Sequence, residues 1–194
     1  MVEGYKPVKH PGRLPMGGDF EFLPGKHPLN RIMFKGIFDW ETLYAFIKNW
    51  FEDREYFFEE GTLKTKDDKF GKETEYKWSG WRKVDEYYKY TIKIELHLWG
   101  LRPVEVVEHG EKKKLYKGKF IMEFSGKVET DYQGIWKTSR FALNMKNFID
   151  KYFWKGERMA LHVDKLWYIM TKLHGEVKEL LKMHSKGNAY KDNW

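Results

Sequence analysis

Residues 75–99 read EYKWSGWRKVDEYYKYTIKIELHLW, and the second half of this stretch decides the fold. From Tyr88 to Leu98 every second residue is apolar, and the residues between them are polar or charged. A period of two, rich in β-branched and aromatic side chains, predicts a strand with one buried and one solvated face. Such strands are typical of an antiparallel sheet that is covered on a single side.

The rest of the chain supplies further strands and the helices that cover the sheet. We expect strands at residues 31–38, 56–65, 74–84, 88–98 and 115–132. We expect amphipathic helices at residues 40–53, at 157–184, and between them along the apolar stripe Phe141, Met145, Phe148, Ile149 and Tyr152. Gly80 lies between Trp78 and Trp81, breaks the alternation and predicts a bulge. This order predicts an α+β fold: a curved antiparallel β-sheet packed on one face by an N-terminal helix and two C-terminal helices.

The two ends of the chain differ from this domain, which we place at residues 31–184. Residues 1–30 hold five of the six prolines, a composition that suits neither a helix nor the interior of a sheet. They also carry several large apolar side chains, which an ordinary disordered tail lacks. We interpret residues 1–30 as an extended arm that docks on its own chain or on a neighbour, and residues 185–194 as a C-terminal tail.

The composition bounds the class of protein. A chain of 194 residues is long enough for one generous domain. It has no cysteine, which excludes disulfides and thiolate metal sites, and no apolar run that would span a membrane. The start of the chain lacks the apolar core of a signal peptide, so we expect a cytoplasmic protein. Charges dominated by Lys and Glu, together with the absence of cysteine, favour a thermophilic source.

No pattern typical of an enzyme, a metal site or a cofactor site is found. The three histidines of the last predicted helix, His162, His174 and His184, are spaced too widely to meet on one turn. Glu95 and Glu123 project from the solvated strand faces, where pairing with lysine is the commoner role for a carboxylate. The chain contains neither a glycine-rich phosphate loop nor a nucleophile elbow. We therefore expect a non-catalytic protein with no cofactor.

Basic residues interleaved with aromatic ones are the strongest functional signal. The net charge is +7, which permits binding to nucleic acid, although solubility is the commoner reason for such a charge. On the outer face of the sheet, rings would stack on bases while lysines and arginines meet phosphates. The alternative is that the rings pack between strands or under the arm and the lysines are solvated. The candidate nucleic-acid face consists of Lys77, Trp81, Arg82, Lys83, Lys89 and Lys93, with Tyr87 and Trp99 nearby.

Three functional hypotheses follow. The first is a structural or interaction protein that self-associates through its arm, its tail and its exposed rings, because such rings are enriched at protein interfaces. Its candidate partner-binding residues are Tyr5, Leu14, Phe20, Phe22, Tyr190 and Trp194. The second is a protein that binds RNA or the ribosome through the basic face. The third is a carrier of an apolar ligand, because the order of elements resembles that of helix-grip proteins.

Two stretches also resemble a group of known sequences. Residues 35–39, KGIFD, are followed by an aromatic helix, and the block from Trp78 to Leu98 follows later. Over roughly residues 31–184, the sequence resembles those of uncharacterised small archaeal proteins of unknown function. The resemblance implies an archaeal source and no particular activity.

Overall fold

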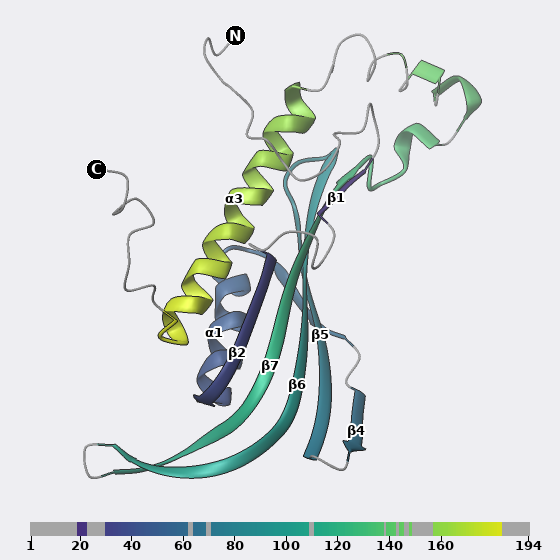
Figure 1. The fold of residues 1–194 in the computed structure, drawn as a ribbon. Helices are drawn as coiled ribbons and strands as arrows, with labels where there is room; N and C mark the ends of the chain where they lie inside the picture. The colour runs from purple at the N-terminus through teal and green to yellow at the C-terminus, as the bar shows by residue number, and fades with distance from the viewer. Residues whose placement is uncertain are drawn as a thin grey trace, which may run out of the picture.

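The fold is given by a computed structural model that describes residues 19–22, 30–61, 64–68, 71–108, 111–137, 139–142, 144, 145, 148 and 157–183. The elements are β1 (Phe20–Phe22), β2 (Arg31–Phe38), α1 (Trp40–Glu52), β3 (Phe57–Glu60), β4 (Lys64–Asp68), β5 (Gly71–Lys83), β6 (Tyr88–Glu108), β7 (Glu111–Thr130), η2 (Ile135–Lys137) and α3 (Glu157–Leu180). Figure 1 shows a long, curved sheet with α1 and α3 on the same side of it. The predicted α+β class is confirmed.

The described strands form one antiparallel sheet with β6 at its centre. The strand order is β1-β7-β6-β5-β3, while β2 also pairs with β7 and β4 also pairs with β5. Two short strands therefore share each outer edge. Because β1 joins the sheet, residues 20–22 of the predicted arm belong to the domain, and the domain begins before residue 31.

The core lies between the sheet and the two helices, as the alternation predicted. The even-numbered residues of β6 from Tyr88 to Leu98 are buried, and Tyr90, Ile92, Ile94 and Leu98 have no exposed surface. In β7 the even-numbered positions continue this layer with Phe120, Met122, Phe124 and Val128, all buried. Burying an apolar side chain of this size stabilises the fold by roughly 1.5–3 kcal/mol. This layer is therefore the main source of stability.

Each helix begins or ends for a local reason. The carboxylate of Asp39 accepts a hydrogen bond from the Thr42 backbone N–H at 3.1 Å, so Asp39 is the predicted N-cap of α1. The last helix ends earlier than predicted. Its backbone turns at Lys182, where φ is +55°, and the Met183 N–H donates to the Lys178 carbonyl at 2.9 Å.

The two helices are also tied to each other. The Trp50 Nε1–H of α1 donates to Glu176 Oε2 of α3 at 2.6 Å. Arg54 contributes a second contact to the same carboxylate, with Nη2 at 3.4 Å from Oε1, and its guanidinium lies 4.2 Å from the Trp50 ring centre. Glu176 therefore fixes the position of α3 relative to α1.

The predicted bulge at Gly80 is wrong. The pairing of β5 with β6 is continuous, with Ser79 opposite Lys93 and Gly80 opposite Ile92. A Cβ atom at position 80 would lie 2.3 Å from two ring carbons of Phe51. Glycine is needed here because the Phe51 ring of α1 rests on the strand backbone. Gly126 has the same role under α3, since a Cβ atom there would lie 2.3 Å from Met170 Sδ.

Two further strand predictions are refined. The strand predicted at residues 56–65 is split into β3 and β4, both paired with β5, and the Gly61 N–H between them donates to the Lys77 carbonyl at 2.6 Å. The strand predicted at residues 88–98 continues past Leu98 through an irregularity at Gly100, where φ is +62°. Its register with β7 shifts between Trp99 and Arg102, and β6 then continues to Glu108. Pro103 lies in this extension, where β6 pairs with β7 and β5 has already ended.

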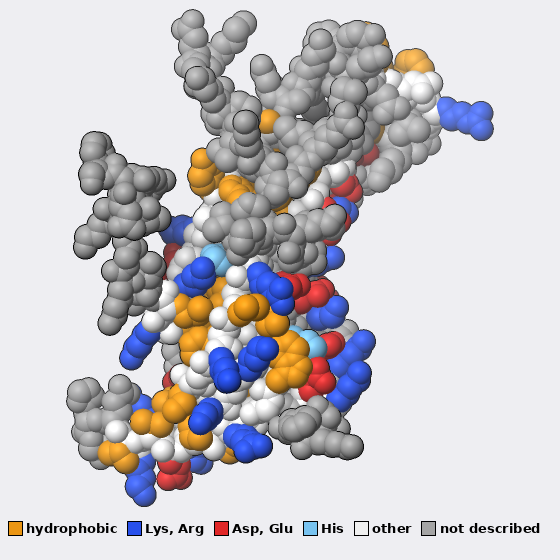
Figure 2. All heavy atoms as spheres, viewed as in Figure 1, with side chains coloured by type: hydrophobic (Ala, Val, Ile, Leu, Met, Phe, Trp, Pro, Cys, Tyr) orange, Lys and Arg blue, Asp and Glu red, His pale blue; other side chains and the backbone are white. Residues whose placement is uncertain are grey.

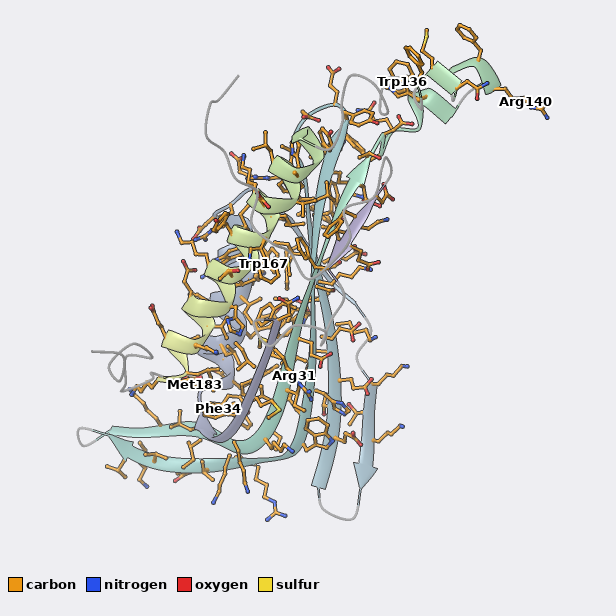
Figure 3. All side chains as sticks on the ribbon, turned by 45° about the horizontal axis from the view of Figure 1, so that its top comes forward. Arg31, Phe34, Trp136, Arg140, Trp167 and Met183 are labelled. Carbon is orange, nitrogen blue, oxygen red and sulfur yellow. The ribbon has the colours of Figure 1, made fainter. Side chains whose placement is uncertain are left out.

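The first C-terminal helix differs from its predicted packing. Residues 140–142, 144, 145 and 148 are helical, but Phe141 is 74% exposed and Met145 is 41% exposed. Ile149 and Tyr152 of the same predicted stripe lie outside the described residues. Trp136 and Arg140 lie beyond the end of the sheet, away from Trp167 of α3 (Figure 3). The described part of this segment therefore does not cover the sheet.

The close approach at Gly80 gives a first prediction. We expect Gly80→Ala to lower the free energy of unfolding by roughly 1–3 kcal/mol, because its methyl group would overlap the Phe51 ring. The control is Gly175→Ala in α3, where a Cβ atom would meet nothing within 4 Å. That change should stabilise the helix by up to about 1 kcal/mol. Urea unfolding of the two variants measures both effects, and equal shifts would contradict the packing described here.

Candidate functional site

The face of the sheet opposite α1 and α3, here called the open face, carries the polar half of the alternation. Lys93, Glu95, His97 and Trp99 of β6 share this face, because alternate residues of a strand point to the same side. Figure 2 shows basic side chains interspersed with exposed hydrophobic ones over the lower half of the molecule.

A shallow hollow of about 410 Å³ lies on the open face. It is lined by Arg31, Glu75, Tyr76, Lys77, Glu95, Leu96, His97, Trp99, Ile121 and Glu123. These residues come from four neighbouring strands, β2, β7, β6 and β5. The antiparallel register places them in cross-strand rows.

Two ion pairs neutralise carboxylates at the hollow. Arg31 Nε lies 3.3 Å from Glu123 Oε1, and Lys77 Nζ lies 3.1 Å from Glu95 Oε1. All four side chains are partly solvated, so each pair contributes on the order of 0–1 kcal/mol to stability. Their importance here is electrostatic, because Glu95 and Glu123 face each other across β6 and β7 with a cation beside each.

The ring of Trp99 lies at one end of the hollow among cationic and acidic neighbours. His97 stacks on this ring, with the two ring centres 3.9 Å apart and an interplanar angle of 25°. His97 Nε2 lies 2.5 Å from Glu73 Oε1 and 3.7 Å from Glu75 Oε1, so the two carboxylates share this one nitrogen. The Lys119 ammonium lies 5.5 Å from the centre of the Trp99 ring.

Positive charge is left over once these pairs are formed. Lys119 stands opposite Trp99 in β6 and opposite Lys35 in β2, so a ring and two lysines form one cross-strand row. Lys117 follows two positions along β7, opposite Arg102. Within the described part of the chain, Lys35, Lys117 and Lys93 have no acidic partner. The uncompensated charge of this face is therefore positive.

A second aromatic pair lies near the other end of the open face. Phe57 of β3 and Trp81 of β5 have ring centres 5.1 Å apart, and Phe57 is 59% exposed. Lys89 Nζ lies 5.4 Å from the Trp81 ring centre and pairs with Glu129 at 3.0 Å. Trp81 lies eight positions along β5 from Glu73, the residue opposite Trp99, which is a distance of about 26 Å.

The structure brings most of the predicted nucleic-acid face together. The five residues on the open face are Lys77, Trp81, Lys83, Lys89 and Lys93. Arg82 is the exception, because it stands opposite Tyr90 on the covered face. Its Nη1 donates to the Arg54 carbonyl at 3.0 Å, and its guanidinium lies 5.0 Å from the Tyr56 ring centre.

Two of the predicted partner-binding residues lie in the core. Phe20 and Phe22 are buried in the chain's own core, where Phe22 lies 5.2 Å from the Trp167 ring centre. They are therefore not exposed for a partner. Tyr5, Leu14, Tyr190 and Trp194 lie outside the described residues.

Sequence reasoning missed the row formed by Lys35, Lys119 and Trp99. Lys119 was recognisable as a solvated position of an alternating strand. The pairing of β2 with β7 could not be predicted, because nothing in residues 31–38 specifies which strand lies beside them. The row exists only because β2 and β6 flank β7.

Among the described residues, the other titratable groups that we consider are structural. His162 Nδ1 forms a hydrogen bond of 2.7 Å with the Tyr90 hydroxyl, and burial lowers the pKa of His174. Burial also raises the pKa of Tyr56 to about 12, so this phenol stays neutral. Among the residues that the structure describes, no cluster of His, Asp and Glu is arranged to hold a metal ion. None of the described helices is both long enough and apolar enough to cross a membrane.

Comparison with known protein families and with curated proteins finds no match to this chain. The geometry of the open face therefore carries the functional argument.

The placement of Arg82 gives a second prediction. We expect Arg82→Ala to lower the free energy of unfolding by roughly 1–3 kcal/mol, because it removes a hydrogen bond and a cation–π contact on the covered face. Lys83→Ala, the next residue on the exposed side, should change it by no more than about 0.5 kcal/mol. Thermal unfolding of both variants provides the comparison. A Lys83 variant as unstable as the Arg82 variant would show that the two faces are assigned wrongly.

Proposed function

We propose that this chain binds single-stranded nucleic acid on the open face of its sheet. The observation that carries the proposal is the row of Trp99, Lys119 and Lys35, a ring flanked by lysines at the edge of the hollow. Aromatic rings on an open sheet stack on unpaired bases, and lysines beside them contact the phosphates.

The charge distribution supports the proposal. At the hollow, Glu95 is paired with Lys77 and Glu123 with Arg31, while Glu73 and Glu75 share His97, which is charged only when protonated. Lys35, Lys93 and Lys117 have no acidic partner within the described residues. A polyanion on this face would meet these three lysines. Binding would release counterions and would weaken as the salt concentration rises.

The spacing of the rings supports an extended ligand. Trp81 and Trp99 lie near opposite ends of the β5–β6 pairing, about 26 Å apart along the strands, with Lys93 between them. Bases have two such rings to stack on, and the backbone between them would pass Lys93. A ligand of several nucleotides fits this arrangement better than a small molecule does.

The other hypotheses have weaker support. Self-association through the arm stays a prediction, although Phe20 and Phe22 are already used by the core. An apolar-ligand carrier needs a cavity between the sheet and α3. At Gly126 a Cβ atom would lie 2.3 Å from Met170 Sδ and 3.2 Å from Leu166 Cδ2, so α3 lies directly on the sheet there.

Binding of a fluorescent 12-nucleotide oligouridine, followed by anisotropy, tests the proposal. We expect Trp99→Ala to weaken binding by about 1–3 kcal/mol, which is roughly 5- to 150-fold in Kd. Lys119→Ala should weaken binding and lower the slope of log K against log salt by about 0.7, the value expected for one lost phosphate contact.

The matched control is Lys165→Ala, which removes an exposed lysine from α3 on the other side of the sheet. It should leave both the affinity and the slope nearly unchanged. Two results would contradict the proposal: no binding by the wild-type chain at low salt, or equal losses for the Lys119 and Lys165 variants.

A further inference from the structure

The segment after β7 exposes apolar side chains at one end of the molecule. The two largest of these, Phe141 and Phe148, are 74% and 54% exposed, and Ile135 and Met145 are exposed as well. Figure 1 shows the segment extending past the end of the sheet, on the far side from α1. Figure 2 shows hydrophobic and basic side chains together at this end.

These apolar side chains lie on one side of a helical segment. Phe141, Met145 and Phe148 follow the spacing i, i+4, i+7, which places residues of an α-helix on one face. Ser139 begins the segment, and its Oγ accepts a hydrogen bond from the Ala142 N–H at 3.1 Å. Arg140 and Asn144, both exposed, flank the apolar face.

The start of the segment is anchored to the sheet. Asp131 is buried just after β7, and its N–H donates to the Tyr87 carbonyl at 2.8 Å. Its carboxylate accepts from the Trp136 N–H at 3.3 and 3.4 Å, and its carbonyl accepts from the Gly134 N–H at 2.9 Å. Asp131 therefore determines the direction in which the chain leaves the sheet.

The charge of this stretch indicates what the apolar side chains contact. Residues 135–155 read IWKTSRFALNMKNFIDKYFWK, with five basic residues, one acidic residue and six aromatic ones. Helices with Trp and Phe on one side and Lys or Arg on the other lie in the interface of a membrane. Protein–protein interfaces are instead depleted in lysine. The composition therefore favours an anionic lipid surface over a second copy of the chain.

We propose that the end of the molecule formed by Ile135, Trp136, Arg140, Phe141, Met145 and Phe148 binds the surface of an anionic membrane. The apolar side chains enter the boundary between headgroups and acyl chains. Arg140 contacts the anionic headgroups, and a basic residue near the surface contributes about 1 kcal/mol. This site is separate from the open face and does not depend on nucleic-acid binding.

Flotation with lipid vesicles tests this proposal on the full chain, treated with nuclease. We expect binding to vesicles of phosphatidylcholine with 30% phosphatidylglycerol and at least ~10-fold weaker binding to phosphatidylcholine alone, because residues 135–155 have more basic than acidic side chains. Phe141→Asp should reduce binding to the anionic vesicles at least ~10-fold, because it replaces the most exposed ring by a charge. The matched control, Tyr168→Asp, puts the same charge on the exposed side of α3 and should bind like wild type.

Three results would overturn the proposal. The first is a wild-type chain that binds neither kind of vesicle, and the second is equal binding by the Phe141 and Tyr168 variants. The third is a change in molar mass by light scattering, without lipid, caused by Phe141→Asp alone, since this would identify a second copy as the occupant. Circular dichroism of both variants shows whether the fold is retained.

Discussion

The structure depends on one constraint: β6 has a single apolar face from Tyr88 to Leu98, and this face must be covered. The even-numbered side chains from Tyr88 to Leu98 have almost no exposed surface. Their burial needs β5 and β7 on either side and two helices above. The opposite face then has no helix among the described elements, and it carries the polar residues of the alternation.

Two glycines let the helices approach closely enough to close this core. Gly80 and Gly126 lie on strands that flank β6, and each leaves room for a large side chain of a helix, Phe51 in one case and Met170 in the other. Dense packing of this kind makes the interior sensitive to the addition of a single methyl group. The same two positions therefore account for the distance between the sheet and each helix.

The alternation of β6 and β7 made the class of fold and the covered face predictable, because burial of one face imposes a period of two on the residues themselves. Gly80 shows where this reasoning failed. The predicted outer face also included the consecutive residues Arg82 and Lys83, whereas continuous pairing places them on opposite faces. The sequence alone does not distinguish a glycine that interrupts strand pairing from one that leaves room for an aromatic ring of a helix.

The strand order could not be predicted from the sequence, for a related reason. The apolar pattern of β2 specifies which of its faces is buried. Which strand pairs with β2 depends on the packing of the whole chain. The row of Lys35, Lys119 and Trp99 depends on that selection. The sequence therefore predicted which kinds of residue form the candidate site, but it identified only some of the residues themselves.

The absence of natural cysteine allows a direct test of the alternation. The single-cysteine variant Lys93→Cys places a thiol on the exposed face of β6. The variant Ile94→Cys, at the next position, places a thiol on the buried face. In the folded protein the thiol at position 93 should react with a maleimide at the rate of a free thiol. The thiol at position 94 should react only as fast as the protein unfolds. Equal, rapid labelling of both would contradict the one-sided sheet on which the account rests.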